Sequence, residues 1–183
     1  IEGSQIKSQE SDYPPNGTSI SIKNLFFNVP ARRKFLKSNP VEIRHIIEEF
    51  ERVAISNSGI SFTMYNNDNE VFNLPDGSFR QRIVGVFGKN FNQKLVPVDE
   101  DTNIVNISGF IGKPDAAKKT RGEQFLFVNN RFIKSPYLHN ANQNAFSDMC
   151  YRFYHKPALP PDREILLILC FSHVFRIPSL YRM

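Results

Sequence analysis

The sequence has 183 residues, 40% of them hydrophobic, which is enough for one full domain or two small ones with a buried core. Its net charge of +5 is compatible with weak attraction to nucleic acid or anionic lipid, although acidic residues run throughout and no long basic tail exists. No apolar run reaches the roughly 18 residues of a spanning helix, and the start lacks a signal-peptide pattern. The two cysteines, Cys150 and Cys170, lack metal-binding spacing, so we expect reduced, buried thiols in a cytosolic protein.

A strand and a basic turn are predicted near the start of the chain. Residues 17–25 alternate hydrophobic and polar side chains, as a half-buried strand does. Positive charges then occur four times within six positions, at Arg32, Arg33, Lys34 and Lys37. Phe26 and Phe27 stand next to these charges, where stacking on single-stranded bases is one interpretation. We favour packing in a core, because the rings flank an apolar strand end.

A long helix follows the basic turn. Asn39, Pro40 and Glu42 form a helix-start pattern with Asn39 as the N-cap. Apolar side chains at steps of three and four residues predict an inward face, formed by Ile43, Ile46, Ile47, Phe50, Val53 and Ala54. The same periodicity predicts that Glu48, Glu49 and Arg52 face water, and that the helix ends near residues 57–59.

The rest of the chain alternates strands and helices. The patterns predict a hairpin of strands 60–65 and 70–74, followed by a helix from Ser78 to Gly88. Further strands are predicted at 95–98, 103–111 and 124–128, with a basic loop at 112–122. A second helix is predicted from Ser135, with Leu138, Ala141, Ala145, Met149 and Phe153 inward, and a buried strand at 165–171. The break at Pro75, Asp76 and Gly77 predicts a domain boundary, which divides the chain into residues 1–77 and 78–183.

Two blocks of the sequence resemble one family. GTSISIKNLFFNVPARRKFLKS, residues 17–38, resembles the motif that marks the MutL family of DNA mismatch repair proteins. GEQFLFVNNRFIKSPYLHNA, residues 122–141, resembles a strand and helix of the family's second domain, with Asn130 where glycine is usual. That change is mild because Asn also tolerates left-handed turns. The resemblance covers residues 1 to about 160 and implies an incomplete amino-terminal region, which agrees with a chain that begins at Ile1.

The resemblance implies an α+β fold in two parts. Residues 1–77 would be the end of the split-ATPase, or GHKL-type, α/β sandwich that type II topoisomerases and histidine kinases share. Residues 78–183 would be a transducer domain with a left-handed β-α-β crossover. The family's ATP site is built mainly from motifs that these 183 residues lack: a magnesium-binding Asn with a general-base Glu, an Asp-x-Gly adenine motif and a glycine-rich lid. We therefore expect ATP and magnesium in the full-length protein and none bound here.

The resemblance also implies site residues and partners. Gly17 and Thr18 match the nucleotide pocket, where the hydroxyl helps to read the adenine edge. DNA contacts are expected from basic side chains at Arg32, Arg33, Lys34, Lys37, Arg131 and Lys134. The implied partners are double-stranded DNA, a MutS-type mismatch-recognition protein and a second copy in the full-length homodimer. The implied location is the bacterial cytoplasm, at the nucleoid and without a membrane.

One alternative function stays open from the sequence. The basic turn and the loop of Lys113, Lys118, Lys119 and Arg121 are also compatible with a stand-alone nucleic-acid-binding module that uses no nucleotide. Motifs upstream of Ile1 would separate the two interpretations. The four histidines, His45, His139, His155 and His173, lack partner spacing and receive no role. Glu48 and Glu49 lie on adjacent helix faces and receive no catalytic role.

The tail departs from the family pattern at about Glu164. The family continues with a strand of the type Pro-Ser-Tyr-Phe-x-x-Phe and later a lysine that reaches the ATP γ-phosphate, whereas this chain reads REILLILCFSHVFRIPSLYRM. With permitted codons, another frame from Glu164 reads Asp-Pro-Ser-Tyr-Phe-Val-Phe-Phe. We hypothesise a frameshift that removed this lysine. We still expect the apolar run 165–171 to fill a sheet, and residues 176–183 to pack poorly.

Overall fold

A computed structural model of the chain describes residues 1, 5–11, 13, 16–102, 105–117, 124–141, 144–145 and 167–173. The chain packs as two compact units, residues 1–47 and residues 48–183, and each is described by itself. Within the described residues, every helix is too short or too polar to span a lipid bilayer. The domain boundary expected between residues 77 and 78 stays a prediction.

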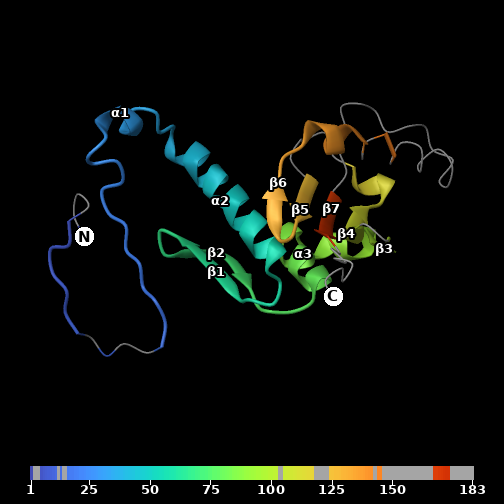
Figure 1. Ribbon diagram of the computed structural model, residues 1–183, viewed down its shortest axis with the longest axis horizontal. Coiled ribbons are helices and arrows are strands. Elements are labelled where there is room, and N and C mark those ends of the chain that lie inside the picture. Colours follow the sequence, from blue (N-terminus) through green and yellow to red (C-terminus); the bar gives the residue numbers. More distant parts are fainter. Residues whose placement is uncertain are drawn as a thin grey trace, which may run out of the picture. The chain divides into compact units, whose positions relative to one another are not determined.

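The first unit holds the short helix α1 (Pro30–Arg33) and the first half of α2 (Asn39–Ser56), as Figure 1 shows. The strand predicted for residues 17–25 is wrong. Residues 18–23 form no regular secondary structure, and Ile20 and Ile22 are 80% and 77% exposed. Alternation supplies a strand's two faces, but a strand also needs a hydrogen-bonded neighbour, and the described residues provide none at this place.

Helix α2 confirms the prediction of a long helix but corrects its details. It begins at Asn39, so Asn39 is its first residue and not its N-cap, and Glu42 reaches back to accept a 2.8 Å hydrogen bond from the backbone N–H of Lys37. Ala54 and Ile55 are buried, whereas Ile46 and Val53, which were predicted to face inward, are about half exposed. Ile43, Ile47 and Phe50 are partly buried, so the predicted inward face is confirmed except at Ile46 and Val53.

The predicted hairpin is confirmed. Strands β1 (Phe62–Asn66) and β2 (Asn69–Leu74) pair antiparallel across a two-residue turn of Asn67 and Asp68. Both turn residues have positive φ, 46° and 64°, a conformation that Asn and Asp tolerate well. Phe50 of α2 stacks on Phe72 at 5.2 Å between ring centroids and meets the edge of Phe62 at 6.1 Å, so the hairpin packs on the helix through aromatic rings.

The helix predicted from Ser78 to Gly88 is confirmed as α3 (Phe79–Phe87). Its start is a capping box: the Ser78 hydroxyl accepts from the Gln81 backbone N–H, and the Gln81 side chain accepts from the Ser78 backbone N–H. Gly88 ends the helix at φ 99° and ψ 155°, a conformation that is almost restricted to glycine. The turn η1 (Lys89–Lys94) then leads into the sheet.

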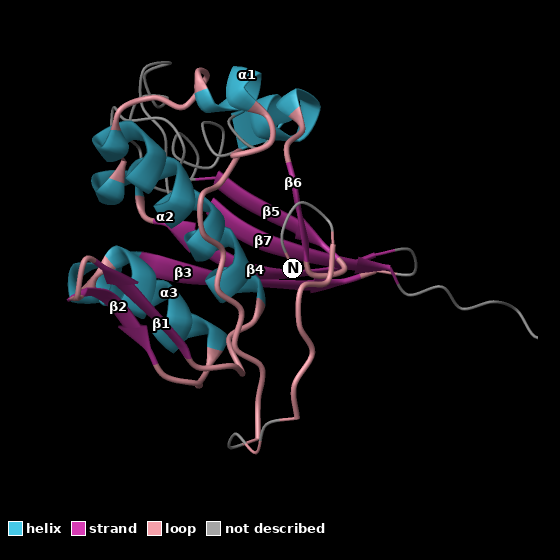
Figure 2. Ribbon diagram, turned by 90° about the vertical axis from the view of Figure 1, so that its left-hand side faces the viewer, coloured by secondary structure: helices cyan, strands magenta, loops and turns pink. Residues whose placement is uncertain are grey.

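A five-stranded sheet forms the body of the second unit (Figures 1 and 2). Its strands, in spatial order, are β3 (Leu95–Asp101), β4 (Val105–Gly112), β7 (Leu167–His173), β5 (Gln124–Val128) and β6 (Arg131–Ile133). All neighbours are antiparallel except β5 and β7, which are parallel. Parallel neighbours need a crossover connection, so the predicted crossover is present, and its left hand stays a prediction.

Both faces of this sheet are covered. One face packs against α3, η1 and the end of α2 through a core of Ile55, Ile83, Phe91, Leu95, Phe125, Phe127 and Ile168. The other face centres on Leu126, with Val98, Ile107, Ile111, Ile133 and Leu138 around it. Leu138 belongs to the predicted helix after Ser135, whose first turns, residues 136–141, are described. Ala141 and Ala145, which were predicted to face inward with Leu138, are exposed. Alternate residues of β5 thus enter opposite cores, as the pleat of a strand requires.

Several expectations lie outside the described residues. They concern residues 118–122 of the basic loop, the side chains of Met149, Cys150 and Phe153, and the tail after residue 173. The described part of the loop forms a short turn, η2 (Pro114–Ala116). The apolar strand predicted at 165–171 is confirmed as β7, which lies in the middle of the sheet.

We predict that Gly88→Ala lowers the free energy of unfolding by about 1–3 kcal/mol, because φ 99° with ψ 155° is strained for any residue with a Cβ. Nothing lies within 4 Å of the added Cβ, so the cost is a backbone effect alone. Gly59→Ala is the matched control: its Cβ also meets open space, its φ lies outside the left-handed region, and we expect a change within about 0.5 kcal/mol. Urea denaturation of both variants measures the difference, and equal stabilities would contradict the assignment.

Candidate nucleic-acid interface

The basic turn of the first unit is built from a tight turn and a proline-initiated helix. Asn24 and Phe26 have positive φ of 52° and 64°, and the Phe27 N–H donates to the Asn24 carbonyl at 2.9 Å. Pro30 then occupies the first position of α1, where a missing N–H costs nothing. The helix ends after one turn, with Lys34 as its C-cap. This local geometry places charged side chains on consecutive positions of one exposed turn.

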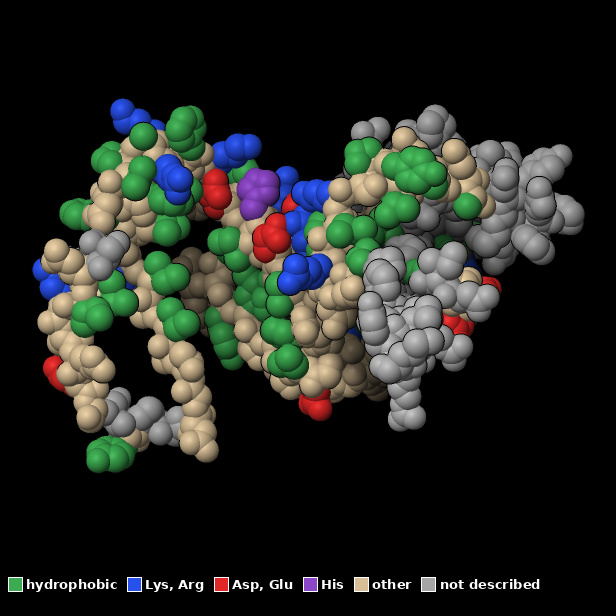
Figure 3. Space-filling model, in the orientation of Figure 1, with side chains coloured by type: hydrophobic (Ala, Val, Ile, Leu, Met, Phe, Trp, Pro, Cys, Tyr) green, Lys and Arg blue, Asp and Glu red, His purple; other side chains and the backbone are tan. Residues whose placement is uncertain are grey.

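The four predicted cations of this turn are all exposed: Arg32, Arg33, Lys34 and Lys37. No carboxylate of the described residues forms an ion pair with them. In Figure 3 their region appears as blue side chains among green ones over α1. Successive helical residues are about 100° apart, so three in a row spread around the helix and cannot all face one groove. The charge is therefore available to an anion, but from more than one direction.

Two aromatic rings beside this charge are exposed, which contradicts the prediction that Phe26 and Phe27 pack in a core. Phe27 is 73% exposed and Phe26 is half-buried; Phe35, in the same stretch, is 82% exposed. None of the residues that the structure describes in this unit is buried, so they form no core for the rings to enter. A concavity of about 430 Å³, lined by Ile1 and residues 22–29, lies against the turn.

Gly17 and Thr18, the predicted nucleotide contacts, are both exposed; Gly17 lies in a bend, and Thr18 begins an irregular segment before this turn. The Thr18 hydroxyl has no hydrogen-bond partner among the described residues, so it remains available as donor and acceptor. Among the same residues, no three His, Cys, Asp or Glu side chains gather as a metal site would require. This part of the chain can therefore offer an adenine-edge contact, but it does not assemble magnesium ligands.

The two cations predicted in the second unit flank strand β6. Arg131 begins the strand and is exposed, and Lys134 follows its last residue and is exposed as well. The turn before Arg131 consists of Asn129 and Asn130 at φ 48° and 62°, which confirms that Asn130 replaces the usual glycine without strain. Arg131 and Lys134 belong to a different unit from the basic turn, so each group is described on its own.

Lys134 lines a cavity of about 440 Å³ in the second unit. Its lining includes the apolar side chains of Phe125, Leu126, Phe132 and Ile133, together with Glu48, Glu51, Arg52, Gln124, Ser135, Pro136 and His139. In this lining Nδ1 of His139 lies 2.9 Å from Oε1 of Gln124. His139, which received no role from its sequence context, thus fixes the first turn of its helix to the start of β5.

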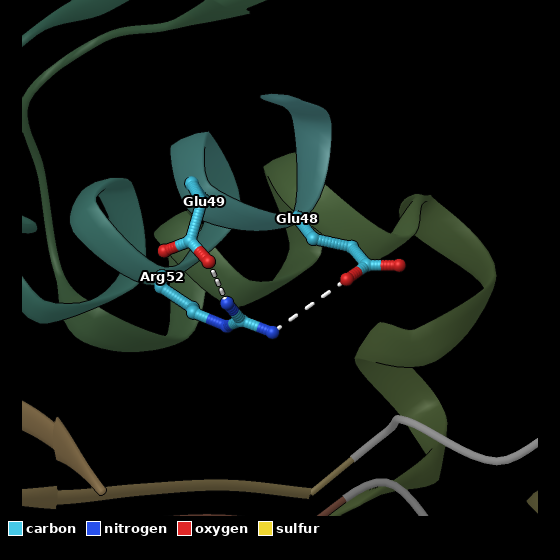
Figure 4. A network of polar contacts seen from close by, with 3 residues as sticks. All are labelled: Glu48, Glu49 and Arg52. Atoms are coloured by element: carbon cyan, nitrogen blue, oxygen red, sulfur yellow. Dashed lines mark hydrogen bonds and ion pairs between the residues drawn. The ribbon is translucent and has the colours of Figure 1, made fainter. Parts of the chain in front are cut away.

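Arg52 is the largest departure from the predicted polar surface. Its side chain is only 15% exposed, and its guanidinium lies 4.5 Å from the centroid of the Phe132 ring. Figure 4 shows it between two acids of the same helix: Glu49 accepts a hydrogen bond from Nη1, and Glu48 lies 3.6 Å from Nη2. Sequence periodicity placed Arg52 in water because the ring that covers it comes from β6, far along the chain.

Comparison with known proteins places these residues in one class. A profile of the family "DNA mismatch repair protein, C-terminal domain" matches residues 83–158. The DNA mismatch repair protein MutL of Christiangramia forsetii is 59% identical over 149 residues, and that of Flavobacterium psychrophilum is 58% identical over the same length. Each alignment covers 81% of this chain and 24% of the relative. The matched residues are thus similar to those of DNA mismatch repair proteins.

Solved structures agree with this class at the level of the fold. The Aquifex aeolicus MutL ATPase domain complexed with ADP has a TM-score of 0.56 and 22% identity, over 82% of this chain and 49% of that one. The N-terminal domain of a DNA repair protein has a TM-score of 0.54 and 18% identity. The expected α+β, GHKL-type fold is therefore confirmed. The chain belongs to the MutL family, and it spans about a quarter of the length of the curated relatives it matches.

We predict that Arg52→Ala lowers the free energy of unfolding by about 1 kcal/mol, chiefly through loss of the contact with Phe132. The two acids contribute less, since partly exposed ion pairs on a helix are weak. Arg52→Met keeps apolar cover over the ring and should cost less than the alanine variant. Arg44→Ala, an exposed change on the same helix, is the control and should stay within about 0.5 kcal/mol. Chemical denaturation checks the order, and an Arg52→Ala value equal to the control would contradict the stacking.

Proposed function

We propose that this chain is the part of a MutL-type protein that joins the end of the ATPase domain to the transducer, and that the whole protein is an ATP-driven DNA clamp. The 59% identity with a curated MutL carries the proposal. In this proposal ATP binding brings two amino-terminal regions together around double-stranded DNA, after a MutS-type protein has recognised a mismatch. The whole protein would act in the bacterial cytoplasm, at the nucleoid, where its DNA substrate lies.

The nucleotide site would receive one side chain from the described residues. The exposed Thr18 hydroxyl, next to Gly17, suits an adenine edge because it can donate and accept at once. Magnesium would be held elsewhere in the whole protein, since the described residues gather no set of carboxylates for it. ATP and its magnesium would supply the closing energy, and this chain's own residues would bind, orient and respond.

DNA binding would be electrostatic and independent of sequence. The cations of the basic turn are exposed and have no acidic partner in the described part of the chain, so each can neutralise a phosphate and release counterions. Arg131 and Lys134, also exposed, would add phosphate contacts from the second unit. Arg52 would contribute little, because Glu48 and Glu49 already balance its charge.

We predict that the 183-residue chain, purified alone, hydrolyses no ATP. Its sequence lacks the family's Asn and Glu pair, the Asp-x-Gly motif and the glycine-rich lid, so nothing activates water or holds magnesium. Phosphate release, measured against a boiled sample, should equal the background. Turnover above background that disappears when magnesium is chelated would contradict this prediction.

We predict that Lys34→Glu with Lys37→Glu in the whole protein weakens binding to all DNA sequences and reduces the slope of log K against log salt by about 2. The reason is that both ammonium groups are exposed and unpaired with acids in the described residues. Fluorescence anisotropy on duplexes of two unrelated sequences, across a salt series, measures the slope. An unchanged slope would show that these lysines face away from DNA.

Lys89→Glu with Lys113→Glu is the matched control for this experiment. Both lysines are exposed, and the pair makes the same change in net charge away from the basic turn. We expect the salt slope of this variant to stay at the wild-type value. If the slope falls for this pair and not for Lys34 and Lys37, the surface around Lys113 holds the DNA and the assignment of the basic turn is wrong.

A further inference from the structure

Arg82 is a charged side chain inside the second unit. It lies in the middle of α3, is 3% exposed, and belongs to the same buried side of the helix as Ile83. Charged side chains are almost never this buried unless they hold something in place. The sequence gives a signal for it in retrospect: Arg82 stands three residues after Phe79 and four before Val86, within the apolar stripe of an amphipathic helix.

A single nitrogen of Arg82 holds three separate carbonyls. Nη2 donates to the carbonyls of Ser58 at 3.0 Å and Pro75 at 3.2 Å, and also to that of Ile60. The first and last of the three acceptors stand 17 positions apart in the sequence (75 − 58), at the two ends of the segment that contains the β1–β2 hairpin. The guanidinium also lies 5.2 Å from the centroid of the Phe62 ring in β1. Arg82 therefore closes the base of the hairpin and attaches it to α3.

The remaining polar groups show that this arrangement costs energy. Nε and Nη1 are buried and have no hydrogen-bond partner among the described residues. Burial lowers the pKa of the guanidinium below its ordinary value, and the nearby carboxylate of Asp76 partly opposes that effect. An apolar residue of similar size would avoid these costs, so the three-way bonding is what a charged residue adds at this position.

A second set of bonds closes the same base. The Gly77 N–H donates to the Ser58 carbonyl at 3.1 Å, and the Asp76 N–H donates to the Ser61 hydroxyl at 3.1 Å. These bonds join the two ends of the hairpin segment to each other, whereas Arg82 joins them to the helix. The domain boundary expected between residues 77 and 78 would run between Arg82 and all three of its acceptors.

We propose that Arg82 is a positioning residue that makes the β1–β2 hairpin and the end of α2 move as one body with α3 and the five-stranded sheet. The part of this inference that concerns nucleotide rests on the proposed function: in the whole protein, Arg82 passes the nucleotide-dependent movement of the ATPase domain to the transducer. It touches neither nucleotide nor DNA in this role. It acts by fixing the β1–β2 hairpin to α3.

The attachment of the β1–β2 hairpin to α3 through Arg82, here called the joint, is tested on the 183-residue chain by hydrogen–deuterium exchange. In Arg82→Met we expect the amides of residues 58–77 to exchange about tenfold faster, while those of β4 and β5 stay within about twofold of wild type. Arg82→Lys should restore most of the protection, because one ammonium can donate to several carbonyls as Nη2 does. Arg80→Met is the matched control on the same helix, since Arg80 bonds only with Asn92 among the described residues and lies over Phe110. Unchanged exchange of residues 58–77 in Arg82→Met would overturn the joint.

The coupling is tested on the whole protein by its retention on DNA with and without a non-hydrolysable ATP analogue. Arg82→Met should reduce the nucleotide effect about tenfold, with the KM for ATP within about twofold of wild type, and Arg82→Lys should recover it. A full nucleotide effect in Arg82→Met, despite a loosened hairpin, would overturn the coupling. If wild type itself shows no nucleotide effect, the proposed function fails while the exchange experiment still decides the joint. Should Arg82→Met fail to fold, Arg82→Gln is judged by the same two criteria.

Discussion

The backbone pairing of strand β7 is the interaction on which the second unit depends. β7 pairs antiparallel with β4 and parallel with β5, so without it the β3–β4 pair and the β5–β6 pair would not form one sheet. A central strand needs satisfied backbone groups and apolar side chains on both faces, and Ile168 is fully buried in one of the two cores. That requirement is general, so the apolar run predicted for residues 165–171 is able to occupy this place. An apolar segment of suitable length can fill a central strand position, whereas a binding site requires particular residues.

Two arginines of this unit are used for assembly rather than for binding. Arg52 lies over Phe132 and is balanced by acids, and Arg82 lies under the hairpin with its charge desolvated. A net charge of +5 therefore does not describe a uniformly basic surface. Exposed cations include those of α1 and the residues after it and the two that flank β6, and these are the positions where phosphate contacts are proposed. Distinguishing the two uses requires knowing which rings and carbonyls surround each guanidinium.

Local chemistry predicted many of the elements of the second unit. Ser78 and Gln81 mark a helix start, Gly88 marks its end, and Asn67 with Asp68 marks the turn of the predicted hairpin; each works through atoms within a few residues of one another. Strand β6, which follows the turn of Asn129 and Asn130, was not predicted. Prediction failed where a partner was needed. Residues 17–25 alternate like a strand but have no neighbour among the described residues, and Phe27 has no core to enter. The inward face of α2 was predicted correctly except at Ile46 and Val53, which are exposed because burial depends on what covers each turn of the helix.

The sequence by itself determined the family, the class of fold, most helices and strands of the second unit and the candidate cations, because motifs, caps and turns are encoded by neighbouring residues. Tertiary structure alone decided that β7 lies at the centre of the sheet, that Arg52 stacks on a ring 80 positions away (132 − 52), and that Arg82 is buried beneath a hairpin. Every residue has a main-chain carbonyl, so the type of a side chain does not reveal whether the carbonyl of its residue accepts a hydrogen bond from a distant group. The contacts of Arg82 therefore could not be read before the carbonyls of Ser58, Ile60 and Pro75 had been brought together in space.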